Sequence, residues 1–100
     1  MTLNDIYTIE SDLDSTEEDY YLSLQRAINS GLGWRLQGGY GRSMMEAIDS
    51  GRCLLGEEPH FDYYGSRIPS RHEVKEGTKG SYQFVVENSG SDWADSVANA

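Results

Sequence analysis

The chain has 100 residues, 37% of them hydrophobic and 25% charged, and its 17 Asp and Glu against 8 Lys and Arg give a formal net charge of −9. This length fits one small domain, and no apolar run approaches the roughly 20 residues of a membrane-spanning helix. The acidity argues against direct binding to nucleic acid, which depends on Lys and Arg to neutralise phosphates, and against anionic membranes.

The acidic residues gather at the two ends of the chain. Residues 1–25 contain seven carboxylates and no Lys or Arg, residues 26–86 hold all eight basic residues, and residues 87–100 add three acids. A block of like charge repels itself, so the pattern indicates an electrostatic partner or a solvated tail. We predict one domain over residues 1–87 with an acidic N-terminal segment 1–19, followed by a flexible acidic tail over 88–100. A high-salt habitat is the alternative explanation of the acidity.

The first quarter of the chain predicts a short strand and then a helix. Residues 6–9 are β-branched and aromatic and favour a strand, although apolar residues at near-helical spacing over 3–13 leave a helix open. Ser15-Thr16-Glu17-Glu18 is a capping box, which predicts a helix over about 16–30 that ends at Gly31. The apolar stripe of this helix consists of Tyr20, Tyr21, Leu24, Ala27 and Ile28.

A second helix is predicted over about 42–50. Its capping box is Ser43-Met44-Met45-Glu46, and residues 44–51 repeat the pattern of residues 24–31. Two copies are too few for a repeat architecture, so the similarity indicates a shared way of ending a helix at glycine. Trp34 and Leu36, between the two helices, are expected to pack beneath them.

The chain beyond residue 56 is irregular and punctuated by Pro and Gly. Asp62-Tyr63-Tyr64-Gly65 predicts a turn, and Ser70-Arg71-His72-Glu73 is a third capping box, which predicts a short helix ending at Gly77. Residues 82–86 fit either a strand or a short helix capped by Ser81. The predicted fold is a small, helix-rich, single-domain α+β protein with two main helices, this irregular segment and at most a small sheet.

Residues that could carry chemistry are sparse. The glycine-rich loop 38–43 leads into a helix N-terminus and offers amides and Arg42 to an anion, but it lacks P-loop spacing and a simple turn explains it. The two histidines and the single cysteine stand at no zinc-ligand spacing. Ser66, His60 and Asp62 lack the strand–turn–helix context of a catalytic serine. We therefore expect no enzymatic activity, no metal and no cofactor.

Repeated basic and tyrosine residues suggest structural or interaction roles. Arg67, Arg71, Lys75 and Lys79 recur every four residues, and we expect them to pair with the acidic ends rather than to form a functional basic patch. Tyrosines occur as doublets at 20–21 and 63–64. One tyrosine of each doublet is expected in the core and the other at an interface, where tyrosine is enriched, with a purely structural role left open.

Four stretches resemble a family of short uncharacterised proteins of tailed bacteriophages and prophages. They are Tyr40-Gly41-Arg42-Ser43-Met44-Met45-Glu46-Ala47-Ile48 and residues 53–56, 62–71 and 74–81. The resemblance covers about residues 34–86 and leaves out the acidic first nineteen. It implies a small phage-encoded protein acting in the host cytoplasm, a reducing compartment that the lone Cys53 also fits. Small acidic phage proteins are often inhibitors of host defence, including anti-CRISPR and anti-restriction proteins.

The function we expect is that of a non-enzymatic acidic binder. It would occupy a basic, nucleic-acid-binding surface of a host protein or nucleoprotein complex, as a phage inhibitor of a bacterial defence system such as CRISPR-Cas. The predicted partner-binding residues are Asp12, Asp14, Glu17, Glu18, Asp19, Tyr20 and Tyr21. The alternative is a virion or replication accessory protein, a structural interaction module that could form a homo-oligomer. An enzyme or small-anion-binding module built on loop 38–43 comes third.

Overall fold

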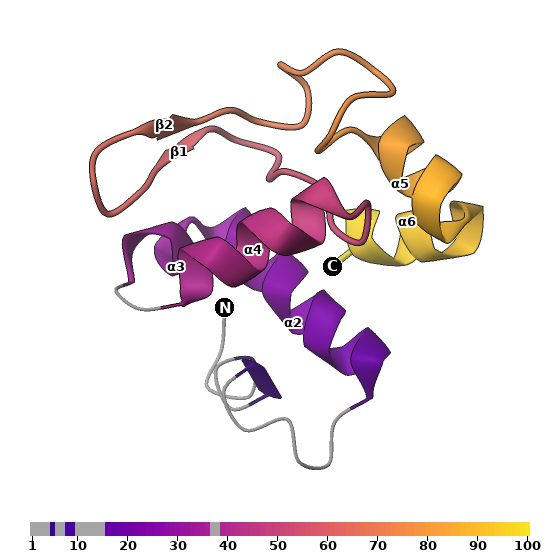
Figure 1. Ribbon diagram of the computed structural model, residues 1–100, viewed down its shortest axis with the longest axis horizontal. Coiled ribbons are helices and arrows are strands. Elements are labelled where there is room, and N and C mark those ends of the chain that lie inside the picture. The colour runs from indigo at the N-terminus through magenta and orange to yellow at the C-terminus, as the bar shows by residue number, and fades with distance from the viewer. Residues whose placement is uncertain (1–4, 6–7, 10–15, 37–38) are drawn as a thin grey trace.

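Helices make up most of the fold in the computed structural model, which describes residues 5, 8–9, 16–36 and 39–100 (Figure 1). The elements are α2 (Glu17–Ser30), α3 (Leu32–Arg35), α4 (Tyr40–Asp49), β1 (His60–Phe61), β2 (Arg67–Ile68), α5 (Tyr82–Ser89) and α6 (Ser91–Ala98). The two strands pair antiparallel, with His60 opposite Ile68 and Phe61 opposite Arg67. The helix-rich α+β class with a small sheet is therefore confirmed. None of the helices in this described part is long and apolar enough to cross a membrane.

The N-cap of helix α2 lies one residue later in the chain than the predicted one. Thr16 is the N-cap: its hydroxyl accepts from the Asp19 amide at 3.1 Å, and the Asp19 carboxylate accepts from the Thr16 amide at 3.4 Å. Ser15 lies outside the described residues. The predicted C-terminus is confirmed, because Gly31 adopts a φ of 76°. A Cβ there would also lie 2.4 Å from Nδ1 of His60, so both the backbone and the packing require glycine.

Helix α4 begins at Tyr40, so the prediction of Ser43 as its N-cap is wrong. Gly39 is the N-cap and provides no side-chain bond, while the Ser43 amide donates to the Gly39 carbonyl at 2.9 Å inside the helix. The glycine-rich loop therefore enters the helix a turn earlier than the capping pattern suggests. Thr8 and Ile9, expected in a strand, are helical, and Ile9 packs against the core.

The main core lies between α2, α3 and α4. Its buried residues are Leu24, Ala27, Ile28, Trp34, Met44, Ala47, Ile48, Cys53 and Leu55. Trp34 is buried there as predicted, whereas Leu36 is only half-buried. Gln25 is a polar residue of α2 with 0% of its surface exposed. It connects α2 to the segment that follows α4. Its side chain accepts from the Leu54 amide at 2.7 Å and donates to the Leu54 carbonyl at 3.0 Å.

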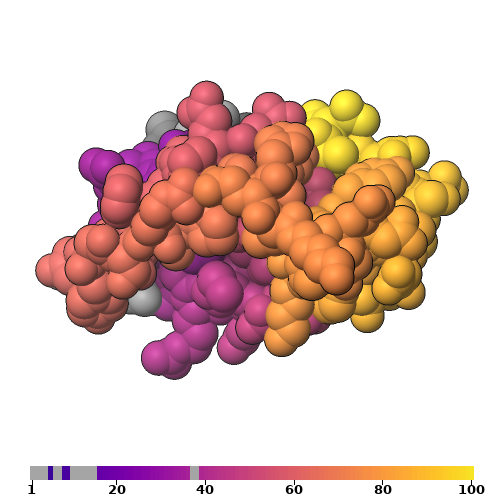
Figure 2. All heavy atoms as spheres, turned by 90° about the horizontal axis from the view of Figure 1, so that it is seen from above, coloured from indigo at the N-terminus to yellow at the C-terminus, as the bar shows by residue number. Residues whose placement is uncertain are grey.

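The segment between the strands and α5 runs across the helices without a helix of its own (Figure 2). The turn predicted at residues 62–65 is confirmed, because Oδ1 of Asp62 accepts from the amides of Tyr64 and Ser66 at 2.9 and 2.8 Å. The helix predicted after Ser70 is wrong. Glu73 does accept from the Ser70 amide at 2.8 Å, as a capping box requires, but its other oxygen binds Arg67 at 2.6 Å. The Glu73 carboxylate therefore links the turn that begins at Ser70 to Arg67 of strand β2.

The Glu73 carboxylate should titrate at unusually low pH. The amide of Ser70, together with the guanidinium of Arg67, holds the pKa of Glu73 at about 2. The unfolded value is about 4.3, so its stabilising contribution is complete above that pH and is lost as pH falls towards 2. Carboxyl-detected NMR titration should give a midpoint near 2 for Glu73. Arg67→Gln should raise it, and a midpoint near 4 in the unmodified protein would contradict this account.

Residues 88–100 form the end of α5 and all of α6, contrary to the flexible tail that the sequence suggests. Ser81 caps α5 by accepting from the Phe84 amide at 3.2 Å, so residues 82–86 are helical rather than a strand. A second core consists of Leu54, Val85, Ala94 and Val97. The sequence gives little sign that α6 is amphipathic, because its apolar residues Ala94 and Val97 are small. Both are nevertheless fully buried.

Candidate functional site

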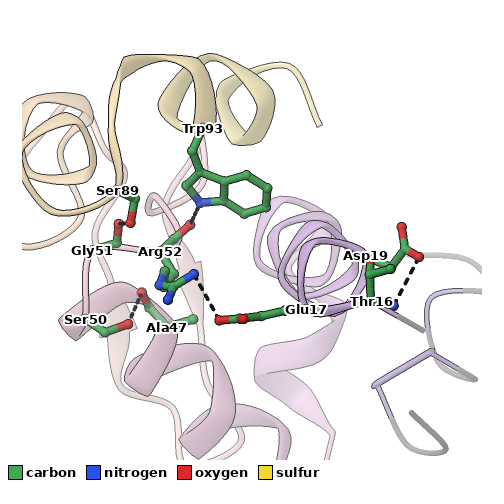
Figure 3. Close-up of polar contacts among 9 residues, drawn as sticks. All are labelled: Thr16, Glu17, Asp19, Ala47, Ser50, Gly51, Arg52, Ser89 and Trp93. Carbon is green, nitrogen blue, oxygen red and sulfur yellow. Dashed lines mark hydrogen bonds and ion pairs between the residues drawn. The ribbon is translucent and has the colours of Figure 1, made fainter. Parts of the chain in front are cut away.

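The predicted acidic site corresponds to the first turn of α2. Glu17, Glu18 and Asp19 are all exposed there, at the helix end where backbone amides favour negative charge. Figure 3 shows Glu17 directed towards Arg52 from the loop after α4, while Asp19 turns back to Thr16. Asp12 and Asp14 lie outside the described residues.

The three carboxylates differ in their availability to a partner. Glu17 lies 3.1 Å from the Arg52 guanidinium, but both side chains are largely exposed, at 65% and 43%. An ion pair this exposed contributes at most about 1 kcal/mol, so a partner can displace it. Asp19 is engaged in the capping box. Glu18 is exposed and, within the described part of the chain, forms no ion pair, so a partner has no such contact to displace there.

The two tyrosines of α2 do not divide into one core and one exposed residue. Both are half-buried against the main core, and their rings meet edge-to-face with centroids 5.2 Å apart. The Arg52 guanidinium lies 5.2 Å from the centroid of the Tyr21 ring. Burial raises the pKa of Tyr21, against the opposing effect of Arg52. The Tyr21 ring is therefore held by packing against the core and Arg52, beside the carboxylates of the first turn of α2. The other doublet is exposed at both positions, 52% for Tyr63 and 87% for Tyr64.

The C-terminal helices contribute to the same surface, which sequence reasoning missed. Glu17, Glu18, Tyr21 and Arg52 line a depression of about 340 Å³ together with Ser89 and Trp93. The indole nitrogen of Trp93 donates to the Arg52 carbonyl at 2.7 Å, and the Ser89 hydroxyl donates to the Gly51 carbonyl at 2.8 Å (Figure 3). The two acid-rich ends of the chain therefore meet around Arg52. The one hint in the sequence is a tryptophan within an otherwise small and polar tail.

Among the described residues, the spaced basic residues bind partners in the middle of the chain and not the acidic ends that the sequence suggests. Arg67 binds Glu73, Lys79 lies 3.8 Å from Asp49, and Arg71 donates to the Leu55 carbonyl at 2.8 Å. Two of the described N-terminal acids find their basic partners in the helical half, where Arg26 binds Asp5 at 2.7 Å and Arg52 binds Glu17 at 3.1 Å. In the part of the chain that the structure describes, the exposed acids Glu18, Asp19, Glu87, Asp92 and Asp95 form no ion pair.

The described residues bring together no group of three His, Cys, Asp or Glu that could hold a metal. Asp62 belongs to the set of Ser66, His60 and Asp62 that was considered as a catalytic triad. Its carboxylate is engaged in the hairpin turn, where Oδ1 accepts from two backbone amides. Cys53 is buried and burial raises the pKa of its thiol to about 12, so it is not a reactive thiolate at neutral pH.

Comparison of the chain with protein-family models, with curated proteins and with solved structures finds no match. The class of protein is therefore defined by fold and surface alone. It is a small helix-rich α+β domain in which an exposed acidic helix end, two aromatic walls and the C-terminal helices form one face. The resemblance of residues 34–86 to small phage proteins stays a prediction.

Proposed function

We propose that this protein is a non-enzymatic binder that covers a basic, nucleic-acid-binding surface of a host protein. The observation that carries the proposal is the depression around Arg52, where the exposed Glu17 and Glu18 lie beside Ser89 and Trp93 of the C-terminal helices. With the phage resemblance, the most specific form of this function is inhibition of a bacterial defence complex such as CRISPR-Cas. We call the surface formed by Glu17, Glu18, Tyr21, Arg52 and Trp93 the acidic face.

The chemistry of the acidic face suits such a partner. Exposed carboxylates attract a surface built to bind phosphates, and they act over about 8 Å at physiological ionic strength. Tyr21 and Trp93 add half-buried aromatic surface, and such residues often dominate binding energy at protein interfaces. Glu87 and Asp92, both exposed, adjoin in sequence the α5 and α6 residues that line the depression.

The alternative is an accessory or assembly module of the virion or of the replication machinery. The exposed hairpin favours it, because Phe61, Tyr63 and Tyr64 are 50%, 52% and 87% exposed. Exposed aromatic residues of this kind mark interaction surfaces when they gather in one place. Such a module would use the hairpin rather than the acidic face for its principal contact.

Charge reversal on α2 should slow binding to the partner. The partner is first captured from nuclease-treated bacterial lysate and identified by mass, and its binding kinetics are then measured. Glu17→Lys with Glu18→Lys should lower the association rate about tenfold, because these charges steer the encounter. Raising the salt concentration should lower the rate for the unmodified protein far more than for this variant.

A matched control is available in the same chain. Glu57 and Glu58 are also adjacent and exposed, and they share no depression with the acidic face. Reversing both changes the net charge by the same amount, so it isolates position from total charge. Equal slowing by both double variants, or binding that ignores salt, would remove the acidic face as the binding site and favour the accessory module.

A further inference from the structure

A second hollow, which we call the hairpin groove, lies between the hairpin, α3 and the start of α4. Its volume is about 570 Å³, and its apolar lining includes Trp34, Met45, Tyr63, Tyr64 and Ile68. The backbone holds the two sides together, because the Tyr63 amide donates to the Trp34 carbonyl at 2.8 Å. Figure 2 shows the hairpin projecting at the opposite end of the molecule from α5 and α6. The groove shares no lining residue with the acidic face.

One cation and one anion line the hairpin groove, and they differ in how they are engaged by the rest of the fold. Arg42 lines the groove and is exposed, and within the described part of the chain its guanidinium has no ion pair or hydrogen bond. Asp62 also lines the groove, but its Oδ1 is occupied by the amides of Tyr64 and Ser66. The wall also includes Trp34, whose buried indole nitrogen has no hydrogen-bond partner among the described residues. An occupant therefore meets apolar walls, the unpaired guanidinium of Arg42 and the Asp62 carboxylate, whose Oδ1 is engaged by the turn.

We propose that the hairpin groove binds a short segment of a partner protein in which an apolar side chain stands next to carboxylates. Tyr, Trp and Arg are the residues that dominate protein interfaces, and here all three types line one hollow. The volume exceeds that of one side chain and lies in the range of peptide and ligand sites. The unpaired guanidinium of Arg42 favours a segment that places a carboxylate beside it over one that has none.

Single-stranded nucleic acid is the competing occupant, because aromatic side chains with an arginine also stack bases. The observations disfavour it. The chain carries a formal net charge of −9, and nucleic-acid affinity requires several Lys or Arg to neutralise phosphates. One free arginine beside the groove suits one or two carboxylates better than a phosphate backbone.

Capped model peptides test the proposal without knowledge of the natural partner. Gly-Ser-Asp-Phe-Asp-Ser-Gly, acetylated and amidated, is titrated into the intact protein while amide, indole and methyl resonances are recorded by NMR. The Trp34 indole and Met45 methyl signals should shift together. The peptide with Asn in place of both Asp should bind about fivefold more weakly, as expected for a lost exposed ion pair. The peptide with Ser in place of Phe should not bind.

Two arginine variants assign the effect to a residue. Arg42→Gln should weaken the Asp peptide about fivefold and leave the Asn peptide unchanged, which isolates the coupling between Arg42 and the carboxylates. Arg35→Gln is the control, because Arg35 is equally exposed on α3 but does not line the groove.

Three outcomes would overturn the proposal. The first is equal affinity for the Asp and Asn peptides, and the second is a preference for Asp that survives Arg42→Gln. The third is the absence of shifts at Trp34 and Met45 with several millimolar peptide. Tighter binding of a ten-nucleotide oligothymidine at the same residues would assign the groove to single-stranded nucleic acid instead. Because every variant lies off the acidic face, failure here leaves the proposed function intact, and the reverse also holds.

Discussion

Gln25→Leu is expected to lower the free energy of unfolding by about 3 kcal/mol, although leucine is the more hydrophobic residue. The Gln25 side chain satisfies both the amide and the carbonyl of Leu54, and it also donates to Asn29 at 3.0 Å. Leu54 is fully buried, so neither backbone group can turn to water once the amide is gone. Each buried group left without a partner costs about 1–3 kcal/mol.

The measurement is urea unfolding followed by circular dichroism, with thermal melts in parallel. For a domain of this size each kcal/mol corresponds to about 4–8 °C in Tm. Gln83→Leu is the matched control, because Gln83 also bonds a side chain four residues on, at 3.1 Å from Glu87, but at the surface. It should change stability by less than about 0.5 kcal/mol. Equal effects of the two substitutions would show that the Gln25–Leu54 bonds contribute nothing net.

Removal of residues 91–100 is expected to unfold most of the population at 37 °C. The deletion removes Ala94 and Val97 from the second core and leaves Leu54 and Val85 uncovered. It also removes the Trp93 bond to Arg52 at 2.7 Å and the bond from Asn29 to the Ala100 carbonyl at 3.0 Å. A loss of roughly 4 kcal/mol or more follows from burial and bonds of this kind, and this loss approaches the roughly 5 kcal/mol at the lower end of the usual range of domain stability.

Point substitutions resolve this expectation further. Val97→Ala should cost about 2 kcal/mol and Trp93→Ala about 3 kcal/mol, in line with core truncations elsewhere. Ser96→Ala on the exposed side of the same helix should cost almost nothing. The measurement is the midpoint of chemical unfolding for the unmodified protein and for the three point variants. A truncated chain that melts like the full-length protein would restore the flexible tail predicted from sequence.

Local patterns in the sequence were sufficient for part of this fold. The end of α2 at Gly31 and the turn at residues 62–65 depend on residues close together in the chain, so they could be predicted. The acidic character of the first turn of α2 also follows from sequence alone, since Glu17, Glu18 and Asp19 precede an apolar stripe. The class, helix-rich with a small sheet, followed from these elements and from the scarcity of alternating segments.

The tertiary structure decided the features that depend on distant partners. Whether residues 88–100 pack could not be predicted, because Ala94 and Val97 gain burial only when Leu54 and Val85 are already in place. The Ser70 capping pattern is followed by a turn and not by a helix. Its Glu73 carboxylate accepts from the Ser70 amide through one oxygen and binds Arg67, six residues away, through the other.

Both candidate surfaces share this dependence on long-range contacts. The bond between Trp93 and Arg52 spans 41 residues, and it is this contact that brings the C-terminal helices beside Glu17 and Glu18. Sequence alone determined that the two ends are acidic. Only folding determined that they meet, because burial of apolar surface in the second core carries the polar ends with it.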